Sequence, residues 1–461
     1  MKHLLFLGAA IMVVPSAHAT DLVDAWQAAA THDPDHLAAQ AQRDAGGESA
    51  VQARALQRPS VQFQGGYQYN VTETNARLPE DLEPLFTGSR SGGRASIAVQ
   101  AVQPLYDASK QAQAVQLREK AAGADVQFAA EQQQLILRVG QAYFKLLAAQ
   151  DRLASYQAQV AAADQQRRGA QARFDAGRAR ITDVREAEAR RDASEAQRIG
   201  AEAELAYARA DFAELTGLPT EGLERPADGF QAPPPPAGLE EYIEQAERRS
   251  PLVQAAVHQA RAAGAEIDRY GLAGRPVVEG VAGYQGQYRL GGDSGNGIVP
   301  DRLQSASAGL RITIPLYAGG AIASKEREAR ANASKAARDL DGARRDARLQ
   351  TQQAWYGVST GARRVAALDT AQRSAGLQQV AANTGREVGI RTQDDVLNAQ
   401  NQSFSTDRDR RQAIYDYLTA RLQLAAATGD LNGEALAGIG SVANSDTVSK
   451  IGLMYCQGQL R

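Results

Sequence analysis

Gly177-Arg-Ala-Arg-Ile-Thr-Asp-Val184 has an echo later in the chain, Gly389-Ile-Arg-Thr-Gln-Asp-Asp-Val396. Both stretches lie inside long polar, alanine-rich runs, and their glycines are separated by 212 positions, as are Asp183 and Asp395. A glycine followed by an acidic residue is typical of a tight turn that ends one helix and starts another. We therefore expect two long helices to meet at each turn, one pair in each half of the chain.

Other motifs recur at nearly the same spacing. Gln141-Ala-Tyr-Phe144 matches Gln353-Ala-Trp-Tyr356, and Leu215-Thr-Gly217 matches Ala427-Thr-Gly429, both at an offset of 212 residues. This period is too long for a solenoid and indicates two tandem copies of one large unit. We assign a first repeat (20–228), a proline-rich linker (229–238), a second repeat (239–432) and a C-terminal tail (433–461).

Each repeat is predicted to contain a helix, two strands and two further helices. The first helices are expected over Asp21–Gln57 and Leu239–Ala273, and the strands over about 60–71, 94–104, 277–289 and 304–314. The long helices are expected over Asp107–Ala176, Thr182–Thr216, Ile322–Val388 and Thr392–Thr428, with Thr182 as an N-cap. Core residues on the first of these long helices have coiled-coil spacing, at Leu135, Val139, Ala142, Leu146, Ala149 and Leu153.

The strands alternate between apolar and polar residues, as a strand with one wet face does. Phe63, Tyr67 and Tyr69 share one face with Val61, while glutamines occupy the other, and Pro104 is expected to end the second strand. Four strands cannot close a barrel, and an open sheet edge cannot stand in lipid. If the strands span a membrane, three chains would supply twelve. Two ordinary hairpins in a soluble protein are the alternative.

The N-terminus predicts export. Lys2 and His3 precede an apolar stretch, Leu4 to Val14, and Ala17-His-Ala19 is a cleavage site, so residues 1–19 are interpreted as a signal peptide. An uncleaved anchor is the alternative. The 51 basic and 53 acidic residues nearly balance, which argues against a nucleic-acid partner. The single cysteine, Cys456, cannot form a disulfide within the chain.

No enzymatic motif is evident. The sequence lacks a nucleophile elbow, a phosphate-binding loop and a zinc-protease motif, so we expect no enzyme activity and no cofactor. His32-Asp-Pro-Asp-His36 has the spacing of metal ligands, but no further ligand cluster accompanies it. We interpret this stretch as a helix interruption and predict no metal site.

These features together resemble the TolC-type outer-membrane channel family, the outer-membrane factors of type I secretion and multidrug efflux. The resemblance covers nearly the whole mature chain. It rests on Arg58-Pro59, Pro315-Leu-Tyr-Ala-Gly-Gly320, Gln141–Phe144 and the two glycine turns with their flanking residues. It implies an α+β membrane protein: a homotrimer with a twelve-stranded outer-membrane barrel, an α-helical tunnel across the periplasm and a mixed equatorial region.

The resemblance also implies a passive export conduit with defined partners. These are outer-membrane lipid, a periplasmic adaptor (membrane fusion protein) and an inner-membrane ABC or proton-driven transporter, whose docking opens the periplasmic tip. A periplasmic coiled-coil adaptor or structural protein without a pore is the alternative. Such an adaptor would lack two lipid-facing strand pairs.

Particular residues of the two turns match gate positions of the family. Thr182, Asp183 and Arg391 fall on latch positions that hold the tip closed, and Asp395 falls on a ring of carboxylates at the narrowest point. Asn398 stands where close relatives carry a second aspartate, which implies weaker cation selectivity. Asp394 is a further candidate for the constriction, although it points to another side of the helix. Arg386 replaces a frequent latch tyrosine.

Overall fold

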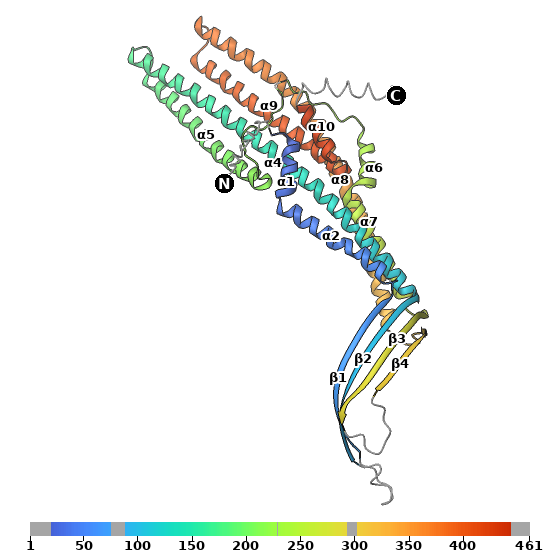
Figure 1. Ribbon diagram of the computed structural model, residues 1–461. Helices are drawn as coiled ribbons and strands as arrows, with labels where there is room; N and C mark the ends of the chain where they lie inside the picture. Colours follow the sequence, from blue (N-terminus) through green and yellow to red (C-terminus); the bar gives the residue numbers. More distant parts are fainter. Residues whose placement is uncertain (1–19, 75–87, 228, 293–301, 444–461) are drawn as a thin grey trace, which may run out of the picture. The chain divides into compact units, whose positions relative to one another are not determined.

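The computed structural model describes residues 20–74, 88–227, 229–292 and 302–443 (Figure 1). The predicted signal peptide, both strand-connecting loops and residues 444–461, with Cys456, lie outside these ranges. Contacts divide the chain into two compact units, a helical unit (1–41, 127–254 and 343–461) and a sheet unit (42–126 and 255–342). The elements in chain order are α1 Leu22–His32, α2 Pro34–Ala55, β1 Ser60–Thr74, β2 Gly88–Tyr106, α4 Ala108–Asp175, α5 Ile181–Thr216, α6 Leu239–Arg249, α7 Pro251–Gly271, β3 Val277–Gly292, β4 Arg302–Thr313, α8 Ala321–Glu387, α9 Gln393–Thr428 and α10 Gly433–Ala443.

The sheet unit contains one antiparallel sheet in the order β1-β2-β3-β4, seen as four long arrows in Figure 1. Its outer pairs, β1–β2 and β3–β4, are the hairpins of the two repeats. The central pair, β2–β3, joins one repeat to the other by an antiparallel ladder. The predicted duplication is therefore built into a single hydrogen-bonded sheet.

The register of the sheet gathers the apolar residues on one face. Phe63 pairs with Val99, Val99 with Tyr284, and Tyr284 with Ala306, so one row crosses all four strands. Directly paired residues of an antiparallel sheet point to the same side. The neighbouring row, which points to the opposite side, contains Gln64, Ala98, Gln285 and Ser305. The predicted division into an apolar and a polar face thus holds in these central rows, while Arg302 and Leu303 of β4 lie on the opposite faces from the ones that this division would give them.

The two outer strands have no further strand beside them among the described residues. All twelve residues of β4 are exposed, including Leu310 and Ile312 at 71% and 65%. Apolar residues of β1 are equally exposed, with Phe63 at 70%. Each outer strand therefore leaves backbone donors and acceptors, and large apolar side chains, without a partner in the single chain.

The strands are longer than predicted, and one expected end is wrong. β2 continues through Pro104 to Tyr106, with a register irregularity between these two residues. Proline cannot donate to the ladder and is tolerated where a bulge interrupts pairing. Pro104 therefore marks an irregularity within β2 instead of its end.

The helical unit buries the predicted coiled-coil positions of α4. Leu135, Val139 and Leu146 are fully buried, and Ala142 and Ala149 nearly so. They pack in one apolar core with residues of α5, α8 and α9. Small alanines let the long helices approach closely, as that spacing predicts. No helix in the described part of the chain has the length and apolar composition needed to cross a membrane.

Two of the predicted helices are corrected. The first predicted helix divides into α1 and α2 at Asp33, and its counterpart divides into α6 and α7 at Ser250. In both cases a proline follows, and a residue before proline is disfavoured in the helical conformation. Besides these two divisions, the structure adds a helix, α10, at the start of the C-terminal tail, for which no element was predicted. The first of these interruptions confirms the interpretation of the His32–His36 stretch.

The segment between α5 and α6, which contains the linker, is held by one aromatic residue from each repeat. The hydroxyl of Tyr143 donates to the backbone oxygens of Thr20 (3.0 Å) and Glu224 (2.8 Å). The indole nitrogen of Trp355, at the equivalent position of the second repeat, donates to the backbone oxygen of Ala237 at 3.2 Å. The repeated Gln-Ala-aromatic motif thus anchors the segment between α5 and α6 at two points, one ahead of the linker and one at its end.

The second repeated motif, Thr-Gly, ends helices. Gly217 and Gly429 follow α5 and α9 with φ angles of +69° and +80°. At Gly429 a Cβ atom would lie 2.5 Å from the backbone oxygen of Arg249. This position therefore requires glycine both for its backbone angle and for the close approach of another chain segment.

We expect Gly429→Ala to lower the melting temperature of the purified protein, measured by circular dichroism. The left-handed backbone alone costs about 1–2 kcal/mol with a side chain, and the clash with Arg249 adds to it. Gly376→Ala is the matched control, because a Cβ at that position in α8 meets no atom within 4 Å. This control should be neutral or slightly stabilising. Equal melting temperatures for the two variants would contradict the assignment.

Candidate functional site

The first turn, between α4 and α5, is closed by backbone hydrogen bonds. The amide of Gly177 donates to Phe174 at 2.8 Å, and that of Arg178 donates to Arg173 at 2.7 Å. Gly177 has a φ angle of +70°, with no atom within 4 Å of a Cβ placed there. The backbone angle, and not lack of space, is thus the reason for glycine at this turn.

The second turn, between α8 and α9, has the same construction. The amides of Ile390 and Arg391 donate to the backbone oxygen of Gly385 at 2.9 and 3.1 Å, and Gly389 has a φ angle of +81°. Gly385 also makes room for the stem of Arg391, because a Cβ there would lie 2.6 Å from its Cγ. The Arg391 stem therefore packs against the backbone of the turn at Gly385.

An aspartate three residues into each returning helix binds the backbone at the helix start. Asp183 accepts from the amide of Arg180 at 3.2 Å, and Asp395 accepts from the amide of Thr392 at 2.9 Å. The amide of Asp395 in turn donates to the hydroxyl oxygen of Thr392 at 3.1 Å, which completes a capping box. The hydrogen bonds from the Thr392 amide and hydroxyl hold the pKa of Asp395 below its ordinary value.

The expectation that Thr182 is the N-cap is wrong. The cap residue of α5 is Arg180, and Thr182 lies inside the first turn of the helix. Its hydroxyl donates to Asp183 at 3.3 Å. The prediction failed because the two repeats differ at the cap position. Threonine caps the second returning helix at position 392, while the equivalent position of the first repeat holds Arg180.

The charged residues of the second turn face different partners. Arg391 Nη1 lies 3.9 Å from Asp395, one helical turn along, and both side chains are more than a third exposed. Asp394 instead lies 3.5 Å from Arg190 of α5, and so connects the two repeats. Asn398 is exposed and lies three residues beyond Asp395, on the same side of α9. Asp395 and Asn398 therefore share a face that Asp394 does not.

Within the single chain, the ion pairs of the described residues do not include one between Asp183 and Arg391. Arg391 is near Asp395, while Asp183 binds only the start of its own helix. Arg386, at the position of the frequent latch tyrosine, donates to Gln393 at 2.9 Å. The latch assignment of Thr182, Asp183 and Arg391 thus stays a prediction.

Apolar side chains are exposed at both turns. Val388 and Ile390 are 66% and 79% exposed, and Ile181 at the first turn is 46% exposed. Large apolar residues next to one another on a surface are typical of an interaction site. These turns thus combine charged residues with an apolar surface.

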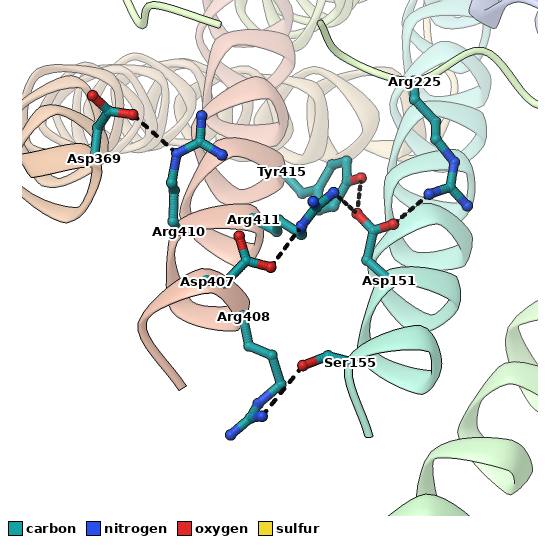
Figure 2. A network of polar contacts seen from close by, with 9 residues as sticks. All are labelled: Asp151, Ser155, Arg225, Asp369, Asp407, Arg408, Arg410, Arg411 and Tyr415. Carbon is teal, nitrogen blue, oxygen red and sulfur yellow. Dashed lines mark hydrogen bonds and ion pairs between the residues drawn. The ribbon is translucent and has the colours of Figure 1, made fainter. Parts of the chain in front are cut away.

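Away from the turns, a buried carboxylate joins the repeats. Asp151 of α4 is 6% exposed and accepts a hydrogen bond of 2.7 Å from the hydroxyl of Tyr415 on α9. Its oxygens also lie 2.6 Å from Arg225, ahead of the linker, and 3.5 Å from Arg411 (Figure 2). Burial, with Asp151 beside it, raises the pKa of the Tyr415 hydroxyl, which remains a donor at neutral pH. Arg411 also forms an ion pair with Asp407, with Nε 3.0 Å from the carboxylate.

The contact between α4 and α9 changes character along its length. Phe144 stacks on Tyr415 at 6.3 Å between ring centres, in the apolar core. Closer to the turns, amide side chains replace apolar ones: Gln159 donates to Asn401 at 3.3 Å, and Gln166 donates to Gln400 at 2.8 Å. Arg408 reaches Ser155 at 3.3 Å between these regions (Figure 2). The repeats are thus packed firmly at one end and hydrogen-bonded towards the turns.

Sequence reasoning did not find the Asp151 cluster or the Arg190–Asp394 pair. Asp151 and Tyr415 are 264 residues apart, and no repeat spacing relates them. The one available signal is that Asp151 lies within a run of buried helix positions, where a carboxylate requires partners.

No group of three or more metal-ligating side chains occurs among the residues that the structure describes. His36 is buried and lies 5.5 Å from the ring of Phe128, and Asp33 accepts from its backbone amide at 3.3 Å. His32 lies under Gly217, where a Cβ would come within 3.1 Å of its Nδ1. The two histidines therefore have separate packing roles.

Comparison with known proteins agrees with this architecture. A family profile described as "Outer membrane efflux protein" matches residues 25–218 and 242–430. The two matched ranges correspond to the two repeats and leave out the linker.

Individual relatives match over nearly the whole chain. "Outer membrane protein TolC" of Vibrio cholerae is 29% identical over 440 residues, which cover 94% of this chain and 96% of the relative. "Alkaline protease secretion protein AprF" of Pseudomonas aeruginosa is 27% identical over 432 residues, which cover 92% and 87%.

A solved structure shows the same fold. The outer membrane protein VceC of Vibrio cholerae superposes with a TM-score of 0.71 at 19% identity, covering 88% of this chain and 96% of that one. The predicted fold class and recognition are confirmed. The chain belongs to the outer membrane efflux protein family, and it is an outer-membrane export channel.

Proposed function

We propose that three copies of the chain form one conduit, with a twelve-stranded barrel in the outer membrane and a helical tunnel in the periplasm. The observation that carries this proposal is the sheet: one apolar face runs across four strands whose outer edges are unpaired. In lipid every backbone group must be paired, and known barrels need at least eight strands. Pairing of β4 with β1 of the next chain satisfies both requirements in a closed ring.

The difference between the two faces of the sheet indicates which face would point to lipid and which to the interior of the barrel. The apolar row with Phe63 and Tyr284 would face lipid, while the row with Gln64 and Gln285 would line the water-filled interior. Aromatic residues are favoured where a barrel meets the membrane surface.

The turns form the periplasmic gate in this proposal. Since Asp183 and Arg391 are not paired within one chain, their pair would form between neighbouring chains and hold the mouth closed. Both side chains are held in place, because Asp183 is hydrogen-bonded to the start of its helix and the stem of Arg391 packs against Gly385. An exposed pair contributes about 0–1 kcal/mol, and three symmetric copies act on one two-state gate.

The constriction is a ring of three Asp395 carboxylates. Three-fold symmetry repeats any pore-lining residue three times, and hydrogen bonds from Thr392 keep Asp395 charged at neutral pH. Asn398, on the same side of α9, adds no charge. Asp394 is directed to Arg190 and is the weaker candidate for the ring. Such a ring favours cations and binds multivalent metal ions.

The exposed apolar residues of the turns support docking of a partner. Val388, Ile390 and Ile181 would be covered by a periplasmic adaptor, and an inner-membrane ABC or proton-driven transporter would supply the cargo. One of the relatives reported above is named an alkaline protease secretion protein, and this name fits such a role. Type I secretion and drug efflux are both served by a conduit of this kind, and the chain itself would transfer cargo without an enzymatic step.

The assembly is tested by fractionation of cells and electrophoresis. We expect the mature chain to be extracted with the outer membrane and to migrate as a trimer that heating converts to monomer. A pore-free periplasmic adaptor would instead be released with the soluble periplasmic fraction. Release in that fraction would overturn the proposal.

The latch is tested by Arg391→Ser in planar-bilayer recordings. Removing a pair worth up to about 1 kcal/mol shifts a two-state equilibrium roughly fivefold, so we expect higher conductance or longer openings. Arg178→Ser is the matched control, because Arg178 is an exposed arginine of the first turn to which no latch position is assigned. If Arg391→Ser and the control both leave the current unchanged, the latch assignment is wrong.

The constriction is tested by Asp395→Asn, measured as the ratio of potassium to chloride permeability. We expect this ratio to fall and block by a trivalent cation to weaken, because the ring loses three charges. Asp394→Asn serves as the control and should change the ratio less. A larger change in the control than in Asp395→Asn would place Asp394 on the pore instead.

A further inference from the structure

A cavity of about 490 Å³ lies in the helical unit between the linker, α8, α9 and α10. One wall is the segment Pro233 to Pro236, and apolar side chains of Tyr242, Leu424 and Ile439 form much of the remainder. Its size falls within the range of small-molecule sites, which are mostly apolar with a few converging polar groups. Its lining contains no residue of the two glycine turns or of the strands.

The proline wall is fixed in place. The hydroxyl of Tyr417 donates to the backbone oxygen of Pro233 at 2.6 Å, and its ring lies 6.0 Å from that of Phe230. Beyond the prolines, Trp355 binds the backbone oxygen of Ala237 at 3.2 Å. Proline restricts its own backbone, so a wall held at both ends needs little reorganisation to receive a ligand.

One arginine lines this cavity. Arg421 lines the cavity, its Nη1 atom is buried without a hydrogen-bond partner, and no ion pair of the described residues includes it. The acidic residue of the lining, Asp430, lies instead 3.3 Å from Arg249 and accepts a hydrogen bond from Gln245.

Arg421 is partly buried, and it acts on two tyrosines of the cavity. Burial raises the pKa of both Tyr242 and Tyr417, the positive charge of Arg421 opposes that rise, and a hydrogen bond from Arg421 opposes it further at Tyr417. A guanidinium beside apolar side chains is stabilised when an anion pairs with it. Arg421 is therefore the group through which this cavity can hold an anion.

We propose that this cavity binds a small amphipathic carboxylate. Its carboxylate would pair with the Arg421 guanidinium, whose planar donors suit bidentate recognition. Its apolar body would pack against the proline wall, Tyr242 and Ile439. The bound anion would contact the linker, α9 and α10 together.

The test uses the full-length protein purified in nanodiscs, with 4-(trifluoromethyl)phenylacetate as the probe, followed by fluorine NMR line broadening. We expect saturable binding to the wild type. The neutral amide of the same probe should bind at least about tenfold more weakly, a factor that corresponds to about 1.4 kcal/mol. This comparison needs no substitution and is independent of any folding defect.

Three variants localise the site. Arg421→Gln should weaken binding of the carboxylate at least about tenfold, and Ala435→Trp, which fills the cavity, should abolish it. Arg364→Gln is the control, because Arg364 is an exposed arginine of α8 outside the cavity, and its affinity should match the wild type. Absence of saturable binding to the wild type, equal affinity for the amide, or an unchanged affinity in Arg421→Gln would each overturn the proposal.

Discussion

Backbone hydrogen bonding decides what this chain can be on its own. The central β2–β3 ladder uses the inner strand of each repeat, and this leaves β1 and β4 as two open edges of one sheet. A short polar edge could remain in water, but these edges carry exposed apolar side chains such as Phe63 and Leu310. The pairing of β2 with β3 that joins the two repeats therefore also leaves two edges that only strands from further copies can pair. Closure into a ring is the one arrangement that pairs every strand without leaving a new edge.

The long helices solve a different problem, because a pair of this length has no globular core to cover it. The repeats share an apolar core around Phe144 and Tyr415, sealed by the Asp151 cluster. Beyond it the contacts are amide pairs such as Gln166–Gln400, and water can replace such bonds at small cost. Apolar contacts and a buried carboxylate cannot be exchanged in this way. The contact between α4 and α9 is therefore weaker towards the turns than in the shared core.

Much of the fold could be predicted because the signals are local or repeated. Alternation defined the strands and their faces, and the glycine turns were visible as an echo. The backbone-bound aspartates, Asp183 and Asp395, also follow from short spacing. The Asp151 cluster and the Arg190–Asp394 pair could not be predicted, since their partners are brought together only by packing of one repeat on the other. The erroneous cap at Thr182 and the erroneous strand end at Pro104 arose from treating a local preference as a boundary, where tertiary contacts decide.

The linker anchors, Tyr143 and Trp355, show that equivalent positions of the two halves keep one task while their chemistry diverges. In the proposed trimer, six such halves alternate around the axis and approximate six-fold symmetry without obeying it. A substitution in one half then alters every second place in the ring and leaves the places between untouched. Gene duplication thus allows the two halves of the chain to change separately: one set of turns can acquire charge while the other continues to support the ring.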